Sequence, residues 1–366
     1  MNIKIKLSSL ASIAFVLAIT APMFVSLLMP DQNISASEKR TLKQWPIFSQ
    51  ADSIKSYFSS VNDYASDHFG FRESLIELNN KIKYALNESP VKSVIRGDGE
   101  WLFYKIHDPL MSNHVNTDET LKGNLQARAN YIKRNYLELK QKNIVYQHIV
   151  VPNKMNLYPE YLPKLYALTD INATYDFFKT QLNDIDDTVA FDAIDALTPN
   201  KKNMKGFDLF FKNDTHWNVL GAYYVYQESF KRLQKKHPEL QLNIKQHTFK
   251  SKIKIGGDLA NYIGLGNALK AQEAVTDFPE CTQRQNIELV RKGLSVAKCG
   301  RNDTTIFLVA DSFMAGIYAY MAESVGTLYM TTQKTNKAEL RNMIEEVNPD
   351  IVIEILIERS LARPLP

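Results

Sequence analysis

Two short segments of the chain carry the residue types of a nucleophile and its base. The segment FKNDTHWN, residues 211–218, places Asp214 two positions before His216, and VADSF, residues 309–313, contains Ser312. A serine hydroxyl becomes an effective nucleophile when a base removes its proton, and a carboxylate can hold an imidazole base in the required tautomer. Asp214, His216 and Ser312 are therefore a candidate set for nucleophilic catalysis.

The Asp-x-His spacing alone leaves other interpretations open. Asp214 is also a favourable N-cap for the helix predicted to follow it, and His216 could be a histidine satisfied within the core. A zinc or iron site is disfavoured because such sites need three protein ligands. The other histidines are scattered singly, at positions 68, 107, 114, 148, 237 and 247. We expect no metal and no cofactor.

The elements around both segments predict an α/β fold. From about residue 120, helical patterns alternate with short apolar strands, which are IVYQHIVVP, TVAFD, TTIFLVA, TLYMTT and DIVIEILI. This alternation predicts a parallel sheet with helices on both faces. Ser312 follows one of these strands and begins a helix, so we expect it at the carboxyl edge of the sheet. Backbone N–H groups and the helix dipole would there favour an oxyanion.

The N-terminal segment differs from the rest of the chain. Residues 7–30 contain no charged side chain and follow Lys4 and Lys6. A run of this length can span a bilayer, and the lysines favour a cytoplasmic N-terminus. We expect residues 7–29 to anchor the protein in the inner membrane, with its body in the periplasm. A removable signal peptide, cleaved near SAS at 35–37, is the alternative.

The predicted organisation is an anchor or signal at 1–30, a polar linker at 31–46 and one catalytic domain at 47–366. Hydrophobic residues make up 45% and charged residues 23% of the 366 positions, which are globular values. The net charge of +4 without a long basic run argues against a nucleic-acid partner. Cys281 and Cys299 would both lie in the exported part, where they could form one disulfide or stay as two buried thiols.

Eight segments give the chain a resemblance to a known family. In chain order they are SEKRTLKQWP, DHFGFR, GDGEWLFY, VPNKMNLYPEYLP, NDTHWNVLGA, GGDLANYIG, ADSFMAG and NPDIVIEILIERSL. In this order and number they resemble the alginate O-acetyltransferase family of SGNH-hydrolase-like periplasmic proteins. The resemblance implies an SGNH-hydrolase-like fold and a Ser-His-Asp triad that falls on Ser312, His216 and Asp214. One departure is Ala310, where the family usually has glycine; alanine would matter if the backbone needed a positive φ.

The resemblance also implies a function. Ser312 would accept an acetyl group, and His216, oriented by Asp214, would transfer protons as the group passes to a hydroxyl of an alginate-like exopolysaccharide. An integral-membrane acyltransferase would supply the acetyl groups. A carbohydrate esterase with the same triad and a non-catalytic subunit of a polysaccharide secretion complex are the alternatives.

Several further residues have weaker predictions. Lys154 and Tyr158 follow a strand and could border the substrate cleft, or only pack. Gly257 could donate an oxyanion N–H. Asp67 and Arg72 are expected to form a structural pair or cap, and Glu358 and Arg359 to pair with neighbouring residues.

Overall fold

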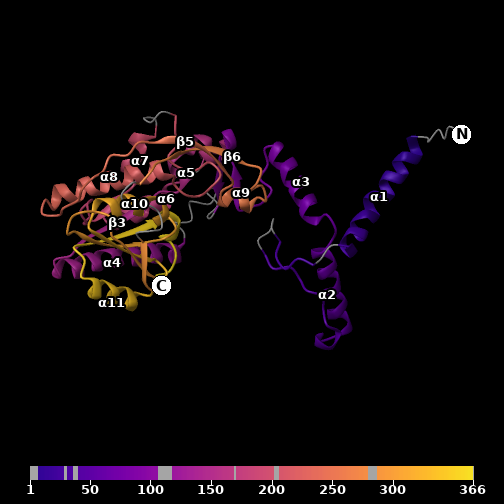
Figure 1. The fold of residues 1–366 in the computed structure, drawn as a ribbon, viewed down its shortest axis with the longest axis horizontal. Helices are drawn as coiled ribbons and strands as arrows, with labels where there is room; N and C mark the ends of the chain where they lie inside the picture. Colours follow the sequence, from indigo (N-terminus) through magenta and orange to yellow (C-terminus); the bar gives the residue numbers. More distant parts are fainter. Residues whose placement is uncertain are drawn as a thin grey trace. The chain divides into compact units, whose positions relative to one another are not determined.

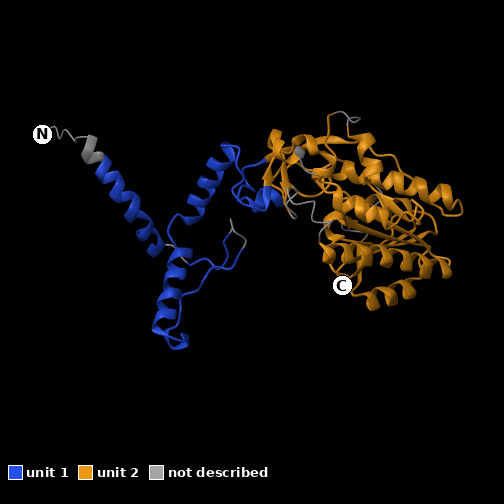
Figure 2. Cartoon of the chain, turned by 180° about the vertical axis from the view of Figure 1, so that it is seen from behind, with its two compact units in different colours: residues 1–94, 258–269 blue, residues 95–257, 270–366 orange. Residues whose placement is uncertain are grey.

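The computed structural model describes residues 7–28, 31–35, 40–105, 118–168, 170–201, 206–278 and 287–365. Its contacts divide the chain into two compact units (Figure 2). The first contains residues 1–94 and 258–269, and the second contains residues 95–257 and 270–366. The predicted domain boundaries after residues 30 and 46 both fall inside the first unit and stay predictions.

The first unit is mainly helical (Figure 1). Its elements are α1 (Leu7–Leu28), η1 (Phe48–Gln50), α2 (Ile54–Asp67), α3 (Arg72–Ala85) and α9 (Asp258–Tyr262). In α1, the stretch Ala11–Leu28 has a mean hydropathy of 2.2 and is long and apolar enough to cross a membrane. Length and composition of this kind fit an anchor and a signal sequence alike.

Asp67 forms a structural ion pair as predicted, but its partner is Arg40 and not Arg72. The buried carboxylate of Asp67 accepts hydrogen bonds from the guanidinium of Arg40 and, at 2.8 Å, from the backbone N–H of Lys43. The Arg40 hydrogen bonds hold the pKa of Asp67 well below its usual range. Arg72 instead lies 3.8 Å from Glu73. Asp67 is thus a structural residue that ties the end of α2 to the segment before it.

The second unit is built around a seven-stranded sheet. Its spatial order is β4 (Ala190–Asp192), β3 (Val145–Val151), β11 (Ile351–Ile357), β9 (Thr305–Ala310), β10 (Thr327–Thr332), β8 (Leu294–Ala297) and β7 (Ile287–Arg291). The first five strands are parallel, and β8 and β7 add an antiparallel edge. Two small antiparallel pairs accompany the sheet: β1 (Val94–Arg96) with β2 (Leu102–Tyr104), and β5 (Lys250–Ile255) with β6 (Lys270–Val275).

Helices cover both faces of this sheet (Figure 1). One hydrophobic cluster joins the sheet to α5 (Lys154–Leu157), α7 (Ile194–Asn200), α8 (Val219–Lys236) and α10 (Met314–Ser324). A second cluster joins the opposite face to α4 (Glu119–Gln141), α6 (Ala173–Thr180) and α11 (Lys337–Val347). Because strand side chains alternate between faces, β11 contributes Ile353 and Ile355 to the first cluster and Val352 and Leu356 to the second.

The predicted α/β fold with helices on both faces is confirmed, but the sheet is mixed rather than wholly parallel. The difference comes from the β7–β8 hairpin, which turns at Gly293 with φ +84° and pairs along β10. Four short 3₁₀ helices, η2 (Asp98–Glu100), η4 (Pro159–Tyr161), η5 (Lys164–Leu168) and η6 (Glu358–Ser360), complete the elements named here. Cys299 is disulfide-bonded, and Cys281 lies outside the described residues.

Candidate active site

A tight loop carries Asp214 and His216 at the start of α8. Phe210 and Trp217 pair as an antiparallel bridge, and the Phe211 N–H donates to the His216 carbonyl at 3.1 Å. The loop is fastened to the serine segment by the Trp217 indole, whose Nε1–H donates to the Phe313 carbonyl at 3.2 Å. Phe210 and Trp217, at the two ends of the loop, therefore fix the position of Asp214 and His216 between them.

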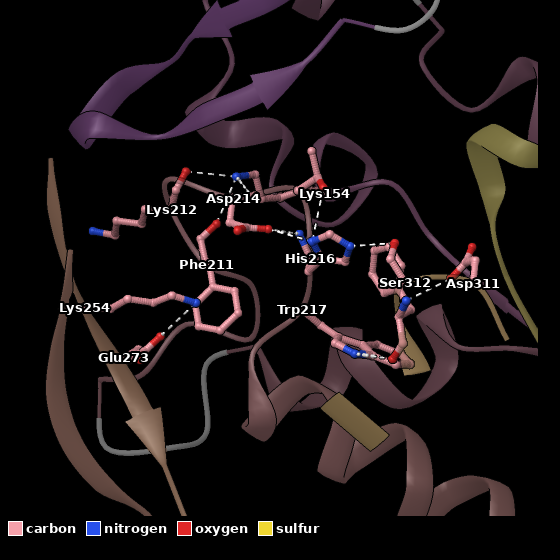
Figure 3. A network of polar contacts seen from close by, with 12 residues as sticks. Lys154, Phe211, Lys212, Asp214, His216, Trp217, Lys254, Glu273, Asp311 and Ser312 are labelled. Carbon is pink, nitrogen blue, oxygen red and sulfur yellow. Dashed lines mark hydrogen bonds and ion pairs between the residues drawn. The ribbon is translucent and has the colours of Figure 1, made fainter. Parts of the chain in front are cut away.

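Asp214, His216 and Ser312 come together in one chain of hydrogen bonds (Figure 3). Nδ1 of His216 lies 2.6 Å from Oδ1 of Asp214, and Nε2 lies 2.7 Å from Oγ of Ser312. The same Asp214 oxygen accepts the His216 backbone N–H at 3.0 Å. The carboxylate thus faces one ring nitrogen and the hydroxyl the other, which is the arrangement that a nucleophile, base and orienting acid require.

The N-cap of α8 is Asn218, not Asp214. Oδ1 of Asn218 accepts the N–H groups of Leu220 and Gly221 at 2.9 and 3.1 Å, and α8 begins at Val219. The alternative in which Asp214 caps the helix is therefore wrong. The carboxylate of Asp214 stays available for the histidine because a neighbouring amide does the capping.

Ser312 occupies the turn between β9 and α10, at the carboxyl edge of the sheet. The carboxylate of Asp311 accepts two backbone N–H groups, from Phe313 and from Ile357, both at 2.9 Å. Asp311 thereby ties the turn to the end of β11. The Ser312 side chain is exposed beside the half-buried His216 ring, so its hydroxyl is accessible to substrate.

Ala310 fits its position without strain. It is a fully buried strand residue that pairs with Thr332 of β10 and Ile355 of β11, and it is not among the residues with positive φ. The departure from the usual glycine therefore demands no unusual backbone conformation.

Lys154 is buried against the loop that carries Asp214 and His216. Its ammonium group donates to three backbone carbonyls, those of Phe211, Lys212 and Asp214, at 2.9, 2.9 and 2.7 Å (Figure 3). The residue is 4% exposed, and its three N–H bonds match these three acceptors. Of the two predicted roles, packing and substrate contact, this burial favours packing, and the three hydrogen bonds of Lys154 hold the segment that carries Asp214.

Tyr158 and Gly257 also lie against this region. Tyr158 is buried, and its hydroxyl oxygen accepts the Leu209 N–H at 2.8 Å, so it packs rather than borders a cleft. Burial raises the pKa of this phenol.

Gly257 has φ +139°, and a Cβ there would lie 2.2 Å from the Asn213 carbonyl oxygen. Glycine is required at this position, while its predicted role as an oxyanion donor stays a prediction.

Several neighbours of the site were not predicted. The Thr215 hydroxyl lies 3.3 Å from Nδ1 of His216 and accepts from Arg359 at 3.5 Å. Lys254 lies 3.6 Å above the Phe211 ring and 3.9 Å from Glu273 (Figure 3). Burial raises the pKa of Glu273, and the charge of Asp214 adds to the effect. Among the residues around the site that were not predicted, only Asp311 could have been found from the sequence, because an aspartate side chain often accepts the backbone N–H two residues later.

Comparisons with known proteins identify the family of this chain. Residues 94–321 match the model of the SGNH hydrolase-like domain of the acetyltransferase AlgX. The probable alginate O-acetylase AlgJ of Pseudomonas fluorescens is 26% identical over 179 residues, which cover 49% of this chain and 43% of that protein. The match thus spans less than half of the relative's length.

Solved structures give a likeness in fold. Bacillus cereus PatB1 superposes with a TM-score of 0.56 at 16% identity, covering 73% of this chain and 96% of that one. Its sulfonyl adduct superposes with a TM-score of 0.53 at 14% identity, covering 75% and 97%. Because the matched domain model covers more than half of the sequence, this chain belongs to the alginate O-acetyltransferase family.

Proposed function

We propose that this protein is an O-acetyltransferase in which Ser312 carries the acetyl group from a donor to a polysaccharide hydroxyl. The observation that carries the proposal is the His216 ring, which is held at 2.6 Å from Asp214 and at 2.7 Å from Ser312. A ring bonded on both sides in this way has a fixed orientation before substrate arrives. A fixed orientation of this kind raises the reaction rate, because less entropy is lost when the transition state forms.

In the first half of the reaction, Oγ of Ser312 attacks the carbonyl carbon of an acetyl donor. Nε2 of His216 takes the hydroxyl proton, and the carboxylate of Asp214 stabilises the imidazolium through Nδ1–H. The tetrahedral intermediate then collapses to an acetyl-serine ester. The leaving group departs with the proton from Nε2, so His216 is neutral again.

In the second half, a sugar hydroxyl attacks the acetyl-serine. Nε2 of His216 accepts the proton of this hydroxyl, and the second tetrahedral intermediate releases Ser312, which takes the proton back. General-base assistance in steps of this kind is worth about 10²–10⁴-fold. The acceptor becomes an O-acetyl sugar, and the enzyme returns to its starting state.

The oxyanion in both intermediates needs hydrogen-bond donors. Among the residues that the structure describes, none accepts a hydrogen bond from the backbone N–H of Ser312. This free N–H precedes α10, whose N-terminal dipole adds positive potential. We assign it as one donor, and Gly257 is the candidate for a second. Removing a single donor of this type costs roughly 10²–10³-fold in rate.

The N-terminal helix and the relatives support a proposal for the setting of the reaction. We propose that α1 holds the protein in the inner membrane with its catalytic unit in the periplasm. The name of the relative AlgJ, an alginate O-acetylase, supports an alginate-like exopolysaccharide as the acceptor. Acetyl groups must then cross the membrane, and we propose an integral-membrane acyltransferase as the partner that delivers them.

The test replaces Ser312 by alanine in the native host and measures the acetate content of the secreted polymer. We expect acetylation to fall to background in Ser312→Ala cells with polymer yield unchanged. Normal acetylation with an equal amount of the variant protein in the membrane would contradict the proposal.

The exposed Ser312 hydroxyl keeps hydrolysis as a second candidate, because water can also reach it. Purified protein given an acetyl ester with and without an oligosaccharide acceptor distinguishes the two. Transferase action predicts acetylated oligosaccharide and a turnover that rises with acceptor concentration. An esterase would release acetate at the same rate in both reactions.

A further inference from the structure

The turn between α2 and α3 packs directly against α1, the helix that we propose as the membrane anchor. Gly70 in this turn is buried, and a Cβ placed on it would lie 2.1 Å from the Pro22 carbonyl oxygen and 2.9 Å from Cβ of Val25. Pro22 is itself buried. A cavity of about 220 Å³ beside this contact is lined by Ser26 of α1 together with residues 67–74. The turn therefore rests on the last part of α1.

The length of α1 decides how deep this contact lies in a bilayer. From Pro22 to Leu28, where α1 ends, the helix rises about 9 Å. If the helix from Pro22 onward stayed in water, only Leu7 to Ala21 would cross the membrane, and about 15 residues rise roughly 22 Å. The hydrocarbon core is about 30 Å thick, and the charged Lys6 precedes Leu7. An α1 that spans the bilayer therefore takes its contact with the turn below the membrane surface.

Two exposed phenylalanines flank Gly70 in this turn. Phe69 is 42% and Phe71 48% exposed. Phe71 has φ +64°, which is an outlier for a bulky L residue and the kind of strain that is kept where it serves a function. The Phe69 carbonyl accepts the Arg72 N–H at 3.0 Å. The Phe71 carbonyl accepts the Leu75 N–H at 2.8 Å, so both acceptors are already satisfied for an apolar medium.

The residues just beyond α1 are of the kinds found at a membrane–water interface. Asp31 accepts the Tyr64 hydroxyl at 2.8 Å and lies 3.4 Å from Nδ1 of His68. Trp45 is 59% exposed and meets the Tyr64 ring edge-on, with centroids 5.0 Å apart. Tryptophan and tyrosine are enriched at the interfaces of membrane proteins. The end of α2 is thus held where α1 leaves the bilayer, and the turn at 69–71 reaches deeper along α1.

We propose that the turn formed by Phe69, Gly70 and Phe71 inserts into the hydrocarbon layer beside α1. The two phenylalanine rings contact lipid acyl chains, and the contact of Gly70 with Pro22 sets their depth. The first unit is then fixed to the membrane at two points, α1 and this turn. The inference rests on the proposed anchoring of the protein by α1.

The test uses purified full-length protein, reconstituted alone in phosphatidylcholine vesicles and carrying one NBD fluorophore on an introduced cysteine. Phe69→Cys and Phe71→Cys place the label in the turn, and Cys299 is held in a disulfide. Leu17→Cys places it in α1. Phe58→Cys on α2 is the matched control, because Phe58 is 64% exposed. Nitroxide groups on the lipid acyl chains quench a label that lies among those chains.

We expect quenching at positions 17, 69 and 71 to be at least about threefold stronger than at position 58, because these labels lie within the hydrocarbon layer. A nitroxide near the headgroup should quench the turn positions best. A nitroxide near the end of the acyl chain should quench position 17 best.

A further pair of variants tests the contact that sets the depth. In the Phe69→Cys protein, Gly70→Ala places a methyl group against the Pro22 carbonyl and should reduce quenching to the level of position 58. Gly123→Ala is its control, because a Cβ on Gly123 would meet no described neighbour within 4 Å. It should leave quenching unchanged.

The label at position 17 separates this inference from the anchor. Quenching at 17 but not in the turn would overturn the inference and leave the anchor standing, whereas no quenching at 17 would remove both. A blue-shifted turn label that the nitroxides do not quench would show that a second copy of the chain covers the turn. Equal quenching at 58, or undiminished quenching in a folded Gly70→Ala variant, would also overturn the inference. Phe69→Cys keeps the test decisive if Phe71→Cys fails to fold.

Discussion

The two segments that carry the proposed triad are held in place by groups of opposite charge. The loop with His216 presents backbone carbonyls inward, and the buried ammonium of Lys154 donates to three of them. The turn with Ser312 presents N–H groups, and the carboxylate of Asp311 accepts two. The Ser312 turn leads directly into α10, and a helix N-terminus leaves N–H donors unpaired, whereas the N–H groups at the start of α8 are capped by Asn218 and the loop before it exposes carbonyls to Lys154. The backbone of each segment thus decides which ionised side chain can support it.

The largest expected effect comes from removing the group that joins the two segments. His216→Ala deletes the ring between Asp214 and Ser312 and should lower kcat for acetyl transfer by about 10⁴-fold, because triad members act as a unit. Turnover of p-nitrophenyl acetate by the purified protein measures this loss. Combining it with Ser312→Ala should cause little further loss; independent, additive losses would show that the residues do not act together.

The second-largest effect on kcat is expected at Lys154, which supports the loop that carries His216. Lys154→Met keeps a long buried side chain but leaves three carbonyls without their donor. We expect kcat to fall roughly 10²-fold with a much smaller change in KM, because Asp214 shifts while substrate contacts stay. The exposed Lys179 of α6 provides Lys179→Met as a control that should keep full activity. If the variant changed KM more than kcat, Lys154 would instead be a substrate contact.

A smaller effect is expected at the serine turn. Asp311→Asn keeps one oxygen to accept a backbone N–H and loses the other, so kcat should fall by about tenfold. Asp311→Ala should fall further because both N–H groups lose their acceptor. Equal activity of both variants and the unmodified protein, measured with the same ester, would show that the turn holds Ser312 without the carboxylate.

The smallest effect on activity is expected at Glu358, whose titration instead changes stability between pH 5 and pH 8. Glu358 accepts the N–H of Asn153, next to Lys154, at 2.9 Å, and burial raises its pKa to about 7 from an ordinary value of 4.5. The native state therefore holds this proton more tightly than the unfolded state. The stability that the protonated carboxyl contributes is complete below pH 4.5 and is lost as pH rises through 7.

Glu358→Gln removes this titration. Urea unfolding should show that the variant gains stability relative to the unmodified protein between pH 5 and pH 8, by up to roughly 3 kcal/mol. A difference between the two proteins that is the same at both pH values would contradict the raised pKa. Activity near neutral pH should change little, since Glu358 touches neither Asp214 nor Ser312.

The elements that position the site could be predicted because each is encoded locally. The apolar runs of β9, β10 and β11 and the periodicity of α8 and α10 predicted a sheet edge at Ser312. The Asp-x-His spacing predicted which carboxylate lies at the His216 ring. The expected proximity of Ser312 and His216 is observed at 2.7 Å, although the catalytic roles of both residues stay proposals.

The supports of the site could not be predicted, because their partners are distant in sequence. Lys154 binds carbonyls 57 to 60 residues later in the chain, and backbone acceptors carry no residue signature. Arg40 rather than Arg72 pairs with Asp67 for a similar reason, since the fold of the preceding segment decides which cation reaches the carboxylate. The antiparallel edge of β7 and β8 was missed because these strands are short and β7 is largely exposed.

The central claim is that Ser312 carries the acetyl group. The most direct measurement is intact and peptide mass spectrometry of the purified protein, quenched after brief incubation with p-nitrophenyl acetate. The account predicts one added acetyl group, mapped to the peptide that contains Ser312, in the unmodified protein and none in Ser312→Ala. Release of nitrophenol by the unmodified protein with the acetyl group on another residue, or with equal labelling of Ser312→Ala, would contradict it.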